Sequence, residues 1–267
     1  MSESSAFAHK YGPWAIVAGA SEGVGREFAR RVAANGVNCI LIARREKPLA
    51  ELAELLRAES RVECIPASID LATPDAYDRI LATVGSREVG LYISNAGADP
   101  NASHFLDRKI ETWIELVHLN LLTTMRCCHH FGGLMRQRRR GGLLLVGSGA
   151  GYGGGPFMAT YSGAKAFELC FGESLWAELR PFGIDVLSLV LVITDTPALR
   201  KLLAEKGQPL PSRMASPARV AEMGLARLPL GPVYNWGPLP RFRAVWRRAR
   251  VRVVARLSKG VFGADST

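Results

Sequence analysis

Seven short apolar runs alternate with longer amphipathic stretches from the first residues to about position 236. The runs span residues 14–20, 37–43, 62–68, 89–95, 142–148, 184–192 and 232–236. Each run is too uniformly apolar to have one face in water, which predicts strands that are buried on both faces. Strands of this kind that are separated by helices form a parallel sheet with helices on both faces. We therefore expect a doubly wound, three-layer α/β fold with about seven strands.

The length of the chain favours a single domain. A chain of 267 residues is long enough to bury one large core and short for two. We expect residues 1–267 to form one domain with a core over about 12–236, and find no internal repeat or interdomain linker. Residues 198–217 are the most irregular part, with scattered prolines and charges, and we expect them to form a lid over the substrate site.

Composition also narrows the class of protein. The first ten residues contain an acid and no apolar run, and the apolar stretch 186–193 is too short to cross a bilayer. We expect a cytoplasmic location and no metal site. The five cysteines are never spaced as C-x-x-C, which favours reduced, buried thiols. The consecutive residues 127–130, two cysteines and two histidines, point in different directions on a helix and cannot all face one ion.

The net charge of +10 is concentrated in residues 136–140 and 241–259. The first cluster ends a long helical pattern, where cations complement the helix dipole. In the second, apolar residues recur at helical spacing among arginines, so that residues 241–262 form a basic amphipathic segment. Such a segment either docks on an anionic membrane surface or covers its own domain with a solvated outer face. Without zinc-finger spacing or an RNA-binding aromatic motif, we expect no nucleic-acid partner.

A glycine-rich turn follows the first predicted strand. Gly19, Gly23 and Gly25 precede a helix that we expect to begin near Val24. Glycines let the backbone turn sharply and approach a pyrophosphate, whose charge the helix N-terminus meets. The spacing G-x-x-x-G-x-G differs from the commonest dinucleotide fingerprint. The turn therefore indicates a dinucleotide site, with simple packing as the alternative.

Polar and small residues follow three further strands. Arg44 and Arg45 end the second strand, where they can pair with a 2′-phosphate, which favours NADP over NAD. Alternatively they are a solvated pair that opens the next helix. Asp70 follows the third strand and residues 95–97 the fourth, and the carboxyl ends of parallel strands form the ligand crevice.

Candidate catalytic residues follow the fifth strand. Ser148 lies at the same sheet edge, and Tyr161 and Lys165 are one turn apart on a helix that we expect to start after Pro156. An ammonium near a tyrosine favours the phenolate form. The six glycines between 147 and 155 predict a small-residue loop that forms one wall of the substrate pocket.

Taken together, these motifs resemble the short-chain dehydrogenase/reductase family over about residues 12–236. The resemblance rests on the glycine pattern, Asp70, the Asn95–Gly97 turn, Asn120, Ser148 and Tyr161-x-x-x-Lys165 in the family's order. It implies a Rossmann-type sheet and an NADP(H)-dependent oxidoreductase that interconverts a secondary alcohol and a ketone. It further implies dimers or tetramers built on the long helices.

The resemblance also implies residue roles. Tyr161 exchanges a proton with the substrate oxygen, Lys165 favours the phenolate and holds the ribose, Ser148 hydrogen-bonds the carbonyl, and Asn120 holds a proton-relaying water. The residues implied to contact the cofactor are Gly19, Ser21, Glu22, Gly23, Val24, Gly25, Arg44, Arg45, Asp70, Leu71, Asn95, Ala96, Gly97, Tyr161, Lys165 and Thr196. From the residues alone, an asparagine that we place in mid-helix costs helix stability and hints at a task for it.

Three features depart from the family pattern. Ala18 and Ser94 replace a threonine and an asparagine, and the expected Pro-Gly after the sixth strand would fall at Leu191 and Val192. That loop shapes the nicotinamide pocket, so the alternative is a non-catalytic NADP-binding scaffold or regulatory protein. A serine hydrolase is excluded because Val146 stands where a G-x-S-x-G elbow needs glycine.

The substrate is only weakly constrained. Phe157 and Met158 beside the glycine loop, with Leu199, Leu202 and Leu203 in the lid, favour an apolar pocket for a steroid-like, acyl or terpenoid substrate. Core packing explains the same residues almost as well.

If the basic segment docks on membranes, the full chain should sediment with vesicles that contain anionic lipid and remain in solution with zwitterionic vesicles. A chain that ends at residue 240 serves as the control and should stay in solution with both. Equal sedimentation of the two chains would exclude this role for residues 241–262.

Overall fold

All seven predicted strands are present and pair in parallel, in the spatial order β3-β2-β1-β4-β5-β6-β7. The computed structural model describes residues 3–236, and the basic segment 241–262 lies outside them. The strands are β1 (Trp14–Ala18), β2 (Asn38–Ala43), β3 (Cys64–Ser68), β4 (Val89–Ser94), β5 (Gly141–Ser148), β6 (Ile184–Leu191) and β7 (Val233–Asn235). Strand order reverses between β1 and β4, which creates a crevice at the carboxyl edge of the sheet.

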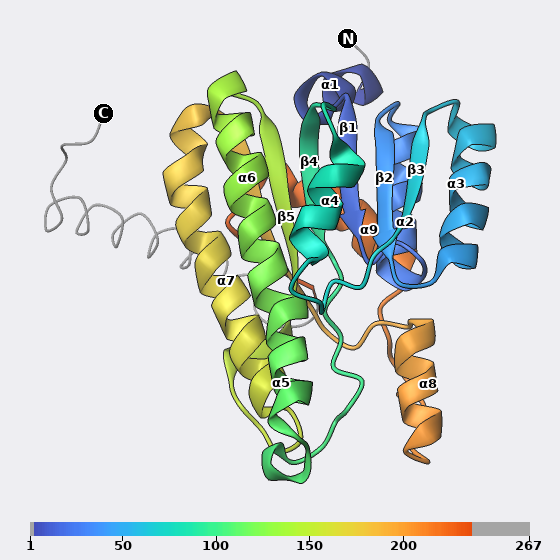
Figure 1. The fold of residues 1–267 in the computed structure, drawn as a ribbon, viewed down its shortest axis with the longest axis vertical. Coiled ribbons are helices and arrows are strands. Elements are labelled where there is room, and N and C mark those ends of the chain that lie inside the picture. Colours follow the sequence, from blue (N-terminus) through green and yellow to red (C-terminus); the bar gives the residue numbers. More distant parts are fainter. Residues whose placement is uncertain (1–2, 237–267) are drawn as a thin grey trace, which may run out of the picture.

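Helices cover both faces of this sheet, which confirms the three-layer, doubly wound prediction (Figure 1). The described helices are α1 (Glu3–Tyr11), α2 (Gly23–Ala34), α3 (Glu46–Ser60), α4 (Ala76–Val84), α5 (Ile110–Val117), α6 (Thr123–Arg138), α7 (Ala159–Leu179), α8 (Pro197–Glu205) and α9 (Pro217–Arg227). Of these, α2, α3 and α9 pack on one face, and α4, α6 and α7 on the other. Alternate residues of β1 supply the two cores: Ala15 and Val17 point to one, Ile16 and Ala18 to the other.

No helix within residues 3–236 combines the length and the apolar character needed to span a bilayer.

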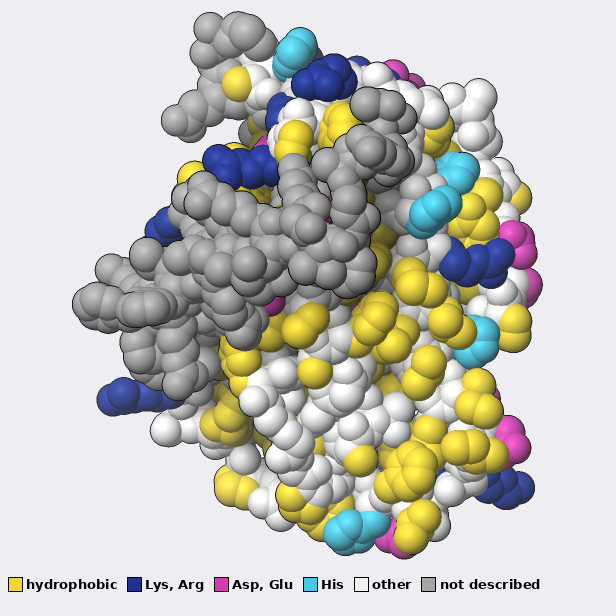
Figure 2. Space-filling model, turned by 90° about the vertical axis from the view of Figure 1, so that its left-hand side faces the viewer, with side chains coloured by type: hydrophobic (Ala, Val, Ile, Leu, Met, Phe, Trp, Pro, Cys, Tyr) yellow, Lys and Arg dark blue, Asp and Glu magenta, His cyan; other side chains and the backbone are white. Residues whose placement is uncertain are grey.

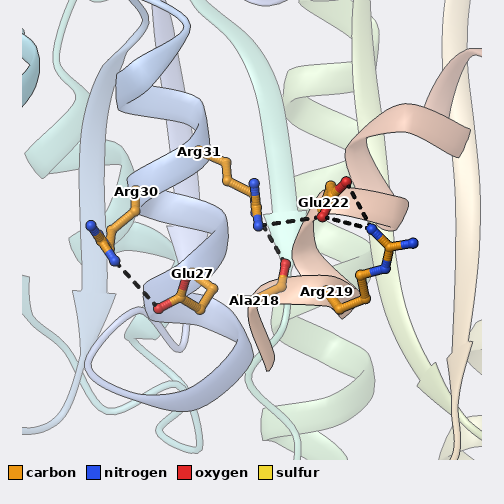
Figure 3. A network of polar contacts seen from close by, with 6 residues as sticks. All are labelled: Glu27, Arg30, Arg31, Ala218, Arg219 and Glu222. Carbon is orange, nitrogen blue, oxygen red and sulfur yellow. Dashed lines mark hydrogen bonds and ion pairs between the residues drawn. The ribbon is translucent and has the colours of Figure 1, made fainter. Parts of the chain in front are cut away.

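An ionic network joins α2 to α9, two helices far apart in sequence (Figure 3). Arg31 Nε donates to the Ala218 carbonyl at 3.1 Å, and its guanidinium lies 3.7 Å from Glu222. Arg219 reaches the other side of Glu222 at 3.2 Å. Since these side chains are largely exposed, the ion pairs add little stability. They fix how α9 lies against the helix that follows the glycine turn.

The N-terminal helix α1 was not predicted, so the core begins before residue 12. Tyr11 is buried, and its hydroxyl donates to Asp185 Oδ2 at 2.8 Å. Lys10 Nζ donates to the Gly183 carbonyl at 2.7 Å. A Cβ at Gly142 would lie 2.9 Å from the Tyr11 ring, so this ring packs directly on the backbone of β5. These contacts attach α1 to the amino edge of the sheet, away from the crevice.

Residues 198–217 are more regular than their composition indicated. The helix α8 begins at Pro197, and Thr196 Oγ1 accepts a hydrogen bond from Leu199 N at 3.2 Å as its N-cap. A threonine followed by proline is a helix start signal that the scattered prolines obscured. None of the side chains of α8 is buried, and Figure 1 shows the helix standing away from the sheet.

The prediction that every cysteine is buried was wrong at one position. Cys39, Cys64, Cys127 and Cys128 are buried, but Cys170 is exposed on α7. The apolar neighbours of Cys170 in sequence lie on other faces of the helix, because a helix turns by 100° per residue.

Replacing Tyr11 by Phe should lower the free energy of unfolding by about 1 kcal/mol at pH 8, because it removes the hydrogen bond to Asp185. Burial and the Asp185 charge raise the pKa of Tyr11 above that of a free tyrosine. The unfolded chain therefore ionises this tyrosine at a lower pH than the folded chain, and the folded protein loses stability above about pH 10. The Tyr11→Phe variant lacks this loss, so the difference in free energy of unfolding between the wild type and the variant should narrow at pH 11.

Urea denaturation at both pH values measures the effect. Tyr77→Phe is the control, since its hydroxyl makes a longer 3.3 Å contact with His130. Equal stability of Tyr11→Phe and the wild type at pH 8 would contradict the anchoring role of α1.

Candidate active site

The glycine turn after β1 packs against the loop after β4. Asn95 Nδ2 donates to the Gly19 carbonyl at 3.1 Å. A Cβ at Gly25 would lie 2.0 Å from the Gly19 oxygen, and one at Gly19, where φ is +79°, would lie 2.8 Å from Ala96 N. Neither position tolerates a side chain without a backbone shift. The structure thus brings together Gly19, Gly25, Asn95 and Ala96, as the dinucleotide-site interpretation requires.

The N-terminus of α2 is open toward the crevice. The helix begins at Gly23, and the N-cap residue Glu22 makes no side-chain capping hydrogen bond. First-turn N–H groups, including that of Val24, can therefore serve an anion. A Cβ at Gly23 would lie 3.1 Å from Thr196 Cγ2, so the start of the lid segment lies directly beside the turn. The cradle fits the pyrophosphate of a dinucleotide.

The two arginines after β2 have different surroundings. Arg45 forms an ion pair with Glu22 at 2.7 Å and donates to Ser21 Oγ at 3.1 Å. Its guanidinium therefore lies across the glycine turn, with Glu22 offsetting part of its charge. Arg44 is exposed, and its carbonyl accepts a hydrogen bond from Ser68 Oγ at 2.9 Å. Two cations thus border the position where a nucleotide ribose would lie.

Asp70 and Leu71 shape the turn after β3. Asp70 Oδ1 accepts from Ala72 N at 3.0 Å, and the Leu71 carbonyl accepts from Thr123 Oγ1 at 3.0 Å. Leu71 is buried. The turn is thereby attached to the start of α6 and closes one side of the crevice.

Lys165 is a buried charged group whose partners are also buried. Its Nζ donates to Glu168 Oε2 at 2.7 Å and to the Val146 carbonyl at 3.2 Å. Only 3% of the Lys165 side chain and 2% of the Glu168 side chain are exposed. The Tyr161 ring centre lies 5.8 Å from the same nitrogen. The predicted tyrosine and lysine are therefore neighbours, and the lysine has a partner that the sequence analysis missed.

Burial and charge act on this pair in opposite directions. Burial alone would lower the pKa of Lys165, but the charges of Glu168 and Tyr161, together with the hydrogen bond to Glu168, outweigh it and raise that pKa. Burial raises the pKa of Glu168 despite the opposing charge of Lys165. The ammonium is therefore retained through neutral and alkaline pH.

Asn120 lies in a single π-helical turn, His118–Leu122, between α5 and α6, and not in a regular helix as expected. Its Nδ2 donates to the Leu116 carbonyl at 2.9 Å, whereas its buried Oδ1 has no partner among the described residues. A Cβ at Gly97 would lie 2.5 Å from this Oδ1 and 2.8 Å from Lys165 Nζ. The backbone at Gly97 therefore covers both groups, and the unpartnered oxygen suits a bound water.

Ser148 ends β5 and begins the glycine loop. Its Oγ accepts from Ala150 N at 3.2 Å. A Cβ at Gly151 would lie 2.7 Å from the Lys165 carbonyl, so this part of the loop packs directly on α7. Nothing lies within 4 Å of the Cβ positions at Gly153 and Gly154. The loop thus combines a tightly packed half with an open half, consistent with a small-residue wall.

Three segments meet beyond this wall. The Phe157 ring lies 4.2 Å from that of His104, between centroids, and Phe157 has a left-handed φ of +66°. Lys206 Nζ, just after α8, donates to the Ala102 carbonyl at 3.4 Å. Leu199, Leu202 and Leu203 on α8 are half-buried. The loops after β4 and β5 and the lid therefore approach one another.

The segment that lacks Pro-Gly remains ordered by its own contacts. β6 ends at Leu191, and Thr194 Oγ1 donates to the Val192 carbonyl at 2.9 Å. Thr194 also bridges to Ala215, which connects the two ends of the lid segment.

Glu168 could have been found from the sequence. It follows Lys165 by three positions, which places both on one face of the helix. By contrast, the contact between His104 and Phe157 joins two loops and leaves no comparable pattern in the sequence.

The chain matches the short chain dehydrogenase family model over residues 13–207. A very-long-chain 3-oxoacyl-CoA reductase of Laccaria bicolor is 36% identical over 203 residues, which cover 74% of this chain and 60% of that protein. The chain spans only 56–60% of the length of this reductase and of two other fungal proteins with the same name, from Podospora anserina and Pyricularia oryzae.

Solved structures share the same architecture over nearly the whole chain. A 7β-hydroxysteroid dehydrogenase is 25% identical with a TM-score of 0.79, and the match covers 98% of this chain and 95% of that one. A short-chain dehydrogenase from Sphingobium yanoikuyae, solved in complex with NADPH, is 25% identical with a TM-score of 0.78, covering 96% and 98%.

Proposed function

Because this chain belongs to the short-chain dehydrogenase family, we propose that it is an NAD(P)-dependent oxidoreductase that interconverts a secondary alcohol and a ketone. The observation that carries the proposal is that Tyr161 lies next to the buried Lys165, on the helix against which the loop after Ser148 packs. The glycine turn after β1 has no room for a Cβ at Gly19 or Gly25.

The bound nicotinamide would supply or accept the hydride. Tyr161 gives its hydroxyl proton to the carbonyl oxygen during reduction and takes it back during oxidation. Lys165 holds a positive charge near this hydroxyl, and Ser148 donates a hydrogen bond to the substrate oxygen. Asn120 holds a water at its unpartnered Oδ1, through which protons pass between Lys165 and solvent. They move inward after reduction, which leaves Tyr161 without its proton, and outward after oxidation.

We propose NADP(H) as the preferred cofactor. Two arginines follow β2, where a preference for NAD would place an acid that binds the ribose hydroxyls. Arg45 is oriented across the turn by Glu22 and Ser21, and the exposed Arg44 supplies a second cation for a 2′-phosphate. The Sphingobium enzyme was solved with NADPH.

The substrate is proposed to be lipophilic. Phe157 and Met158 present exposed apolar surface beside the open half of the glycine loop, and the α8 leucines are only half-buried. Such surfaces favour an apolar ketone. The similar proteins are named for long-chain 3-oxoacyl-CoA and 7β-hydroxysteroid substrates, which supports an acyl or steroid-like skeleton.

The test is reduction of a panel of 3-oxoacyl and steroid ketones with NADPH or NADH. We expect NADPH to give at least tenfold higher kcat/KM than NADH. Tyr161→Phe removes the proton donor and should lower kcat by about 10²- to 10⁴-fold. Tyr77→Phe, which alters a tyrosine on α4, should leave kcat unchanged.

Cofactor binding without turnover of any ketone would support the alternative, a non-catalytic scaffold. Equal activity of Tyr161→Phe and wild type would overturn the assignment of the proton donor.

A homodimer or homotetramer is proposed from the surface of α5, α6 and α7. Ile110 is 55% exposed, and Ile114, Met125 and Phe167 on these helices are also exposed. We call these four residues the α5–α7 patch. Figure 2 looks onto the side where α6 and α7 lie in Figure 1 and shows hydrophobic side chains gathered over its lower half. Clustered apolar surface of this kind marks interaction sites.

Sedimentation velocity should give two or four times the mass of one chain. Glu substitutions at both Ile114 and Phe167 should shift the protein to the monomer, because they place charge in the apolar contact. Leu210→Glu, at a residue exposed to 46% outside the patch, should leave the mass unchanged. A monomeric wild type would exclude the assembly.

A further inference from the structure

The proposed roles of Tyr161 and Lys165 leave the buried acid beside them unexplained. Glu168 lies on the inner face of α7, and its Oε2 accepts from Lys165 Nζ at 2.7 Å. Its other oxygen, Oε1, is buried without a partner among the described residues. A buried carboxylate is costly unless it is fully paired, and an apolar residue in its place is often neutral or stabilising. Packing therefore gives no reason for an acid here.

The geometry gives such a reason. An ammonium has three N–H donors, and two of those of Lys165 are directed to Glu168 and to the Val146 carbonyl of β5. The third N–H donor remains available on the side of the ammonium where Asn120 Oδ1 and the Gly97 backbone lie. Glu168 thus determines how deeply the ammonium sits and which donor remains for a ribose or a water.

The carboxylate also controls the charge of the site. The titratable groups that face the pair are Tyr161 from α7 and Cys128 from α6, with Cys127 and Tyr92 behind Cys128. Burial raises the pKa of Cys128 and Tyr92, and raises that of Cys127 to about 12, so all three are neutral at physiological pH. At the position of Tyr161, Glu168 is therefore the anion whose charge offsets that of the Lys165 ammonium.

We propose that Glu168 is a positioning residue that fixes where the Lys165 ammonium sits and how much of its positive charge reaches the Tyr161 hydroxyl. This rests on the proposed function for its kinetic consequence. Glu168 touches neither substrate nor cofactor and acts entirely through Lys165.

Glu168→Gln tests the proposal, because it keeps the shape and an oxygen acceptor and removes the charge. In the direction of alcohol oxidation, we expect kcat/KM to rise with pH, because the general base must be free of its own proton. The midpoint of this rise should move by roughly one pH unit in Glu168→Gln, because loss of the carboxylate charge both leaves the ammonium without an offsetting anion and lowers the pKa of Lys165. Glu168→Asp keeps the charge and should move the midpoint by less.

The matched control is Glu173→Gln, which alters a second buried acid of the same helix. A structural role for Glu168 would lower thermal stability in both Gln variants without moving either midpoint. An unchanged midpoint in Glu168→Gln, or equal shifts in Glu168→Gln and Glu173→Gln, would overturn the proposal.

A second readout needs no turnover. The ultraviolet absorbance of the Tyr161 phenolate is obtained by subtracting the pH titration of the matching Tyr161→Phe protein, in the wild-type and the Glu168→Gln backgrounds. The proposal predicts a shift of the same sign and similar size in this difference titration. A wild type without activity would refute the proposed function, whereas an unshifted absorbance midpoint would refute the role of Glu168.

If Glu168→Gln does not fold, the KM of Glu168→Asp for NADPH tests the positioning role instead. The ammonium follows the shorter carboxylate, so KM for NADPH should rise several-fold at unchanged kcat. An unchanged KM would overturn the positioning role.

Discussion

The burial of one ammonium group constrains the whole catalytic edge. Lys165 can remain charged inside the protein only because acceptors surround it, and these come from separate elements: Val146 from β5 and Glu168 from α7. The same nitrogen lies under the backbone at Gly97, next to the Asn120 side chain. Displacing any one of these would leave a buried cation unsatisfied. The position of α7 on the sheet and that of the π-helical turn are thus linked through a single side chain.

Sheet topology explains why this edge also receives the cofactor residues. The reversal of strand order between β1 and β4 separates the loops that follow them, and the turn after β1 fills the start of the gap. The turn approaches the loop after β4 so closely that Gly19 and Gly25 have no room for a Cβ. Backbone contact at this point determines where the N-terminus of α2 is directed, and hence where an anion can bind.

The sequence could predict the sheet, and it could name candidate site residues, because both leave local patterns. Strands buried on two faces read as uniform apolar runs, and the glycine turn, Asp70, the Asn95–Gly97 turn and Ser148 end or follow such runs. What it could not predict depends on tertiary contact. The helix α1 has a weak pattern of its own and is anchored by Asp185, far away in sequence. The π-helical turn at Asn120 and the exposure of Cys170 follow from how helices are rotated against their neighbours. Glu168 had a readable signal, its spacing from Lys165, but an acid on a helix is ordinarily a solvated residue.

The shallow attachment of α8 has a consequence for how this fold can change over time. The helix buries no side chain, and its polar contacts include a cap at Thr196, an ion pair between Arg200 and Asp195, and a hydrogen bond from Lys206 just after the helix. Substitutions along it therefore cost little folding free energy, in contrast to substitutions in α7, where each buried residue supports the core. Selection can vary the surface of α8 while the residues proposed to transfer the proton stay fixed. The proposed substrate surface and the stability of the fold thereby depend on different segments of one chain.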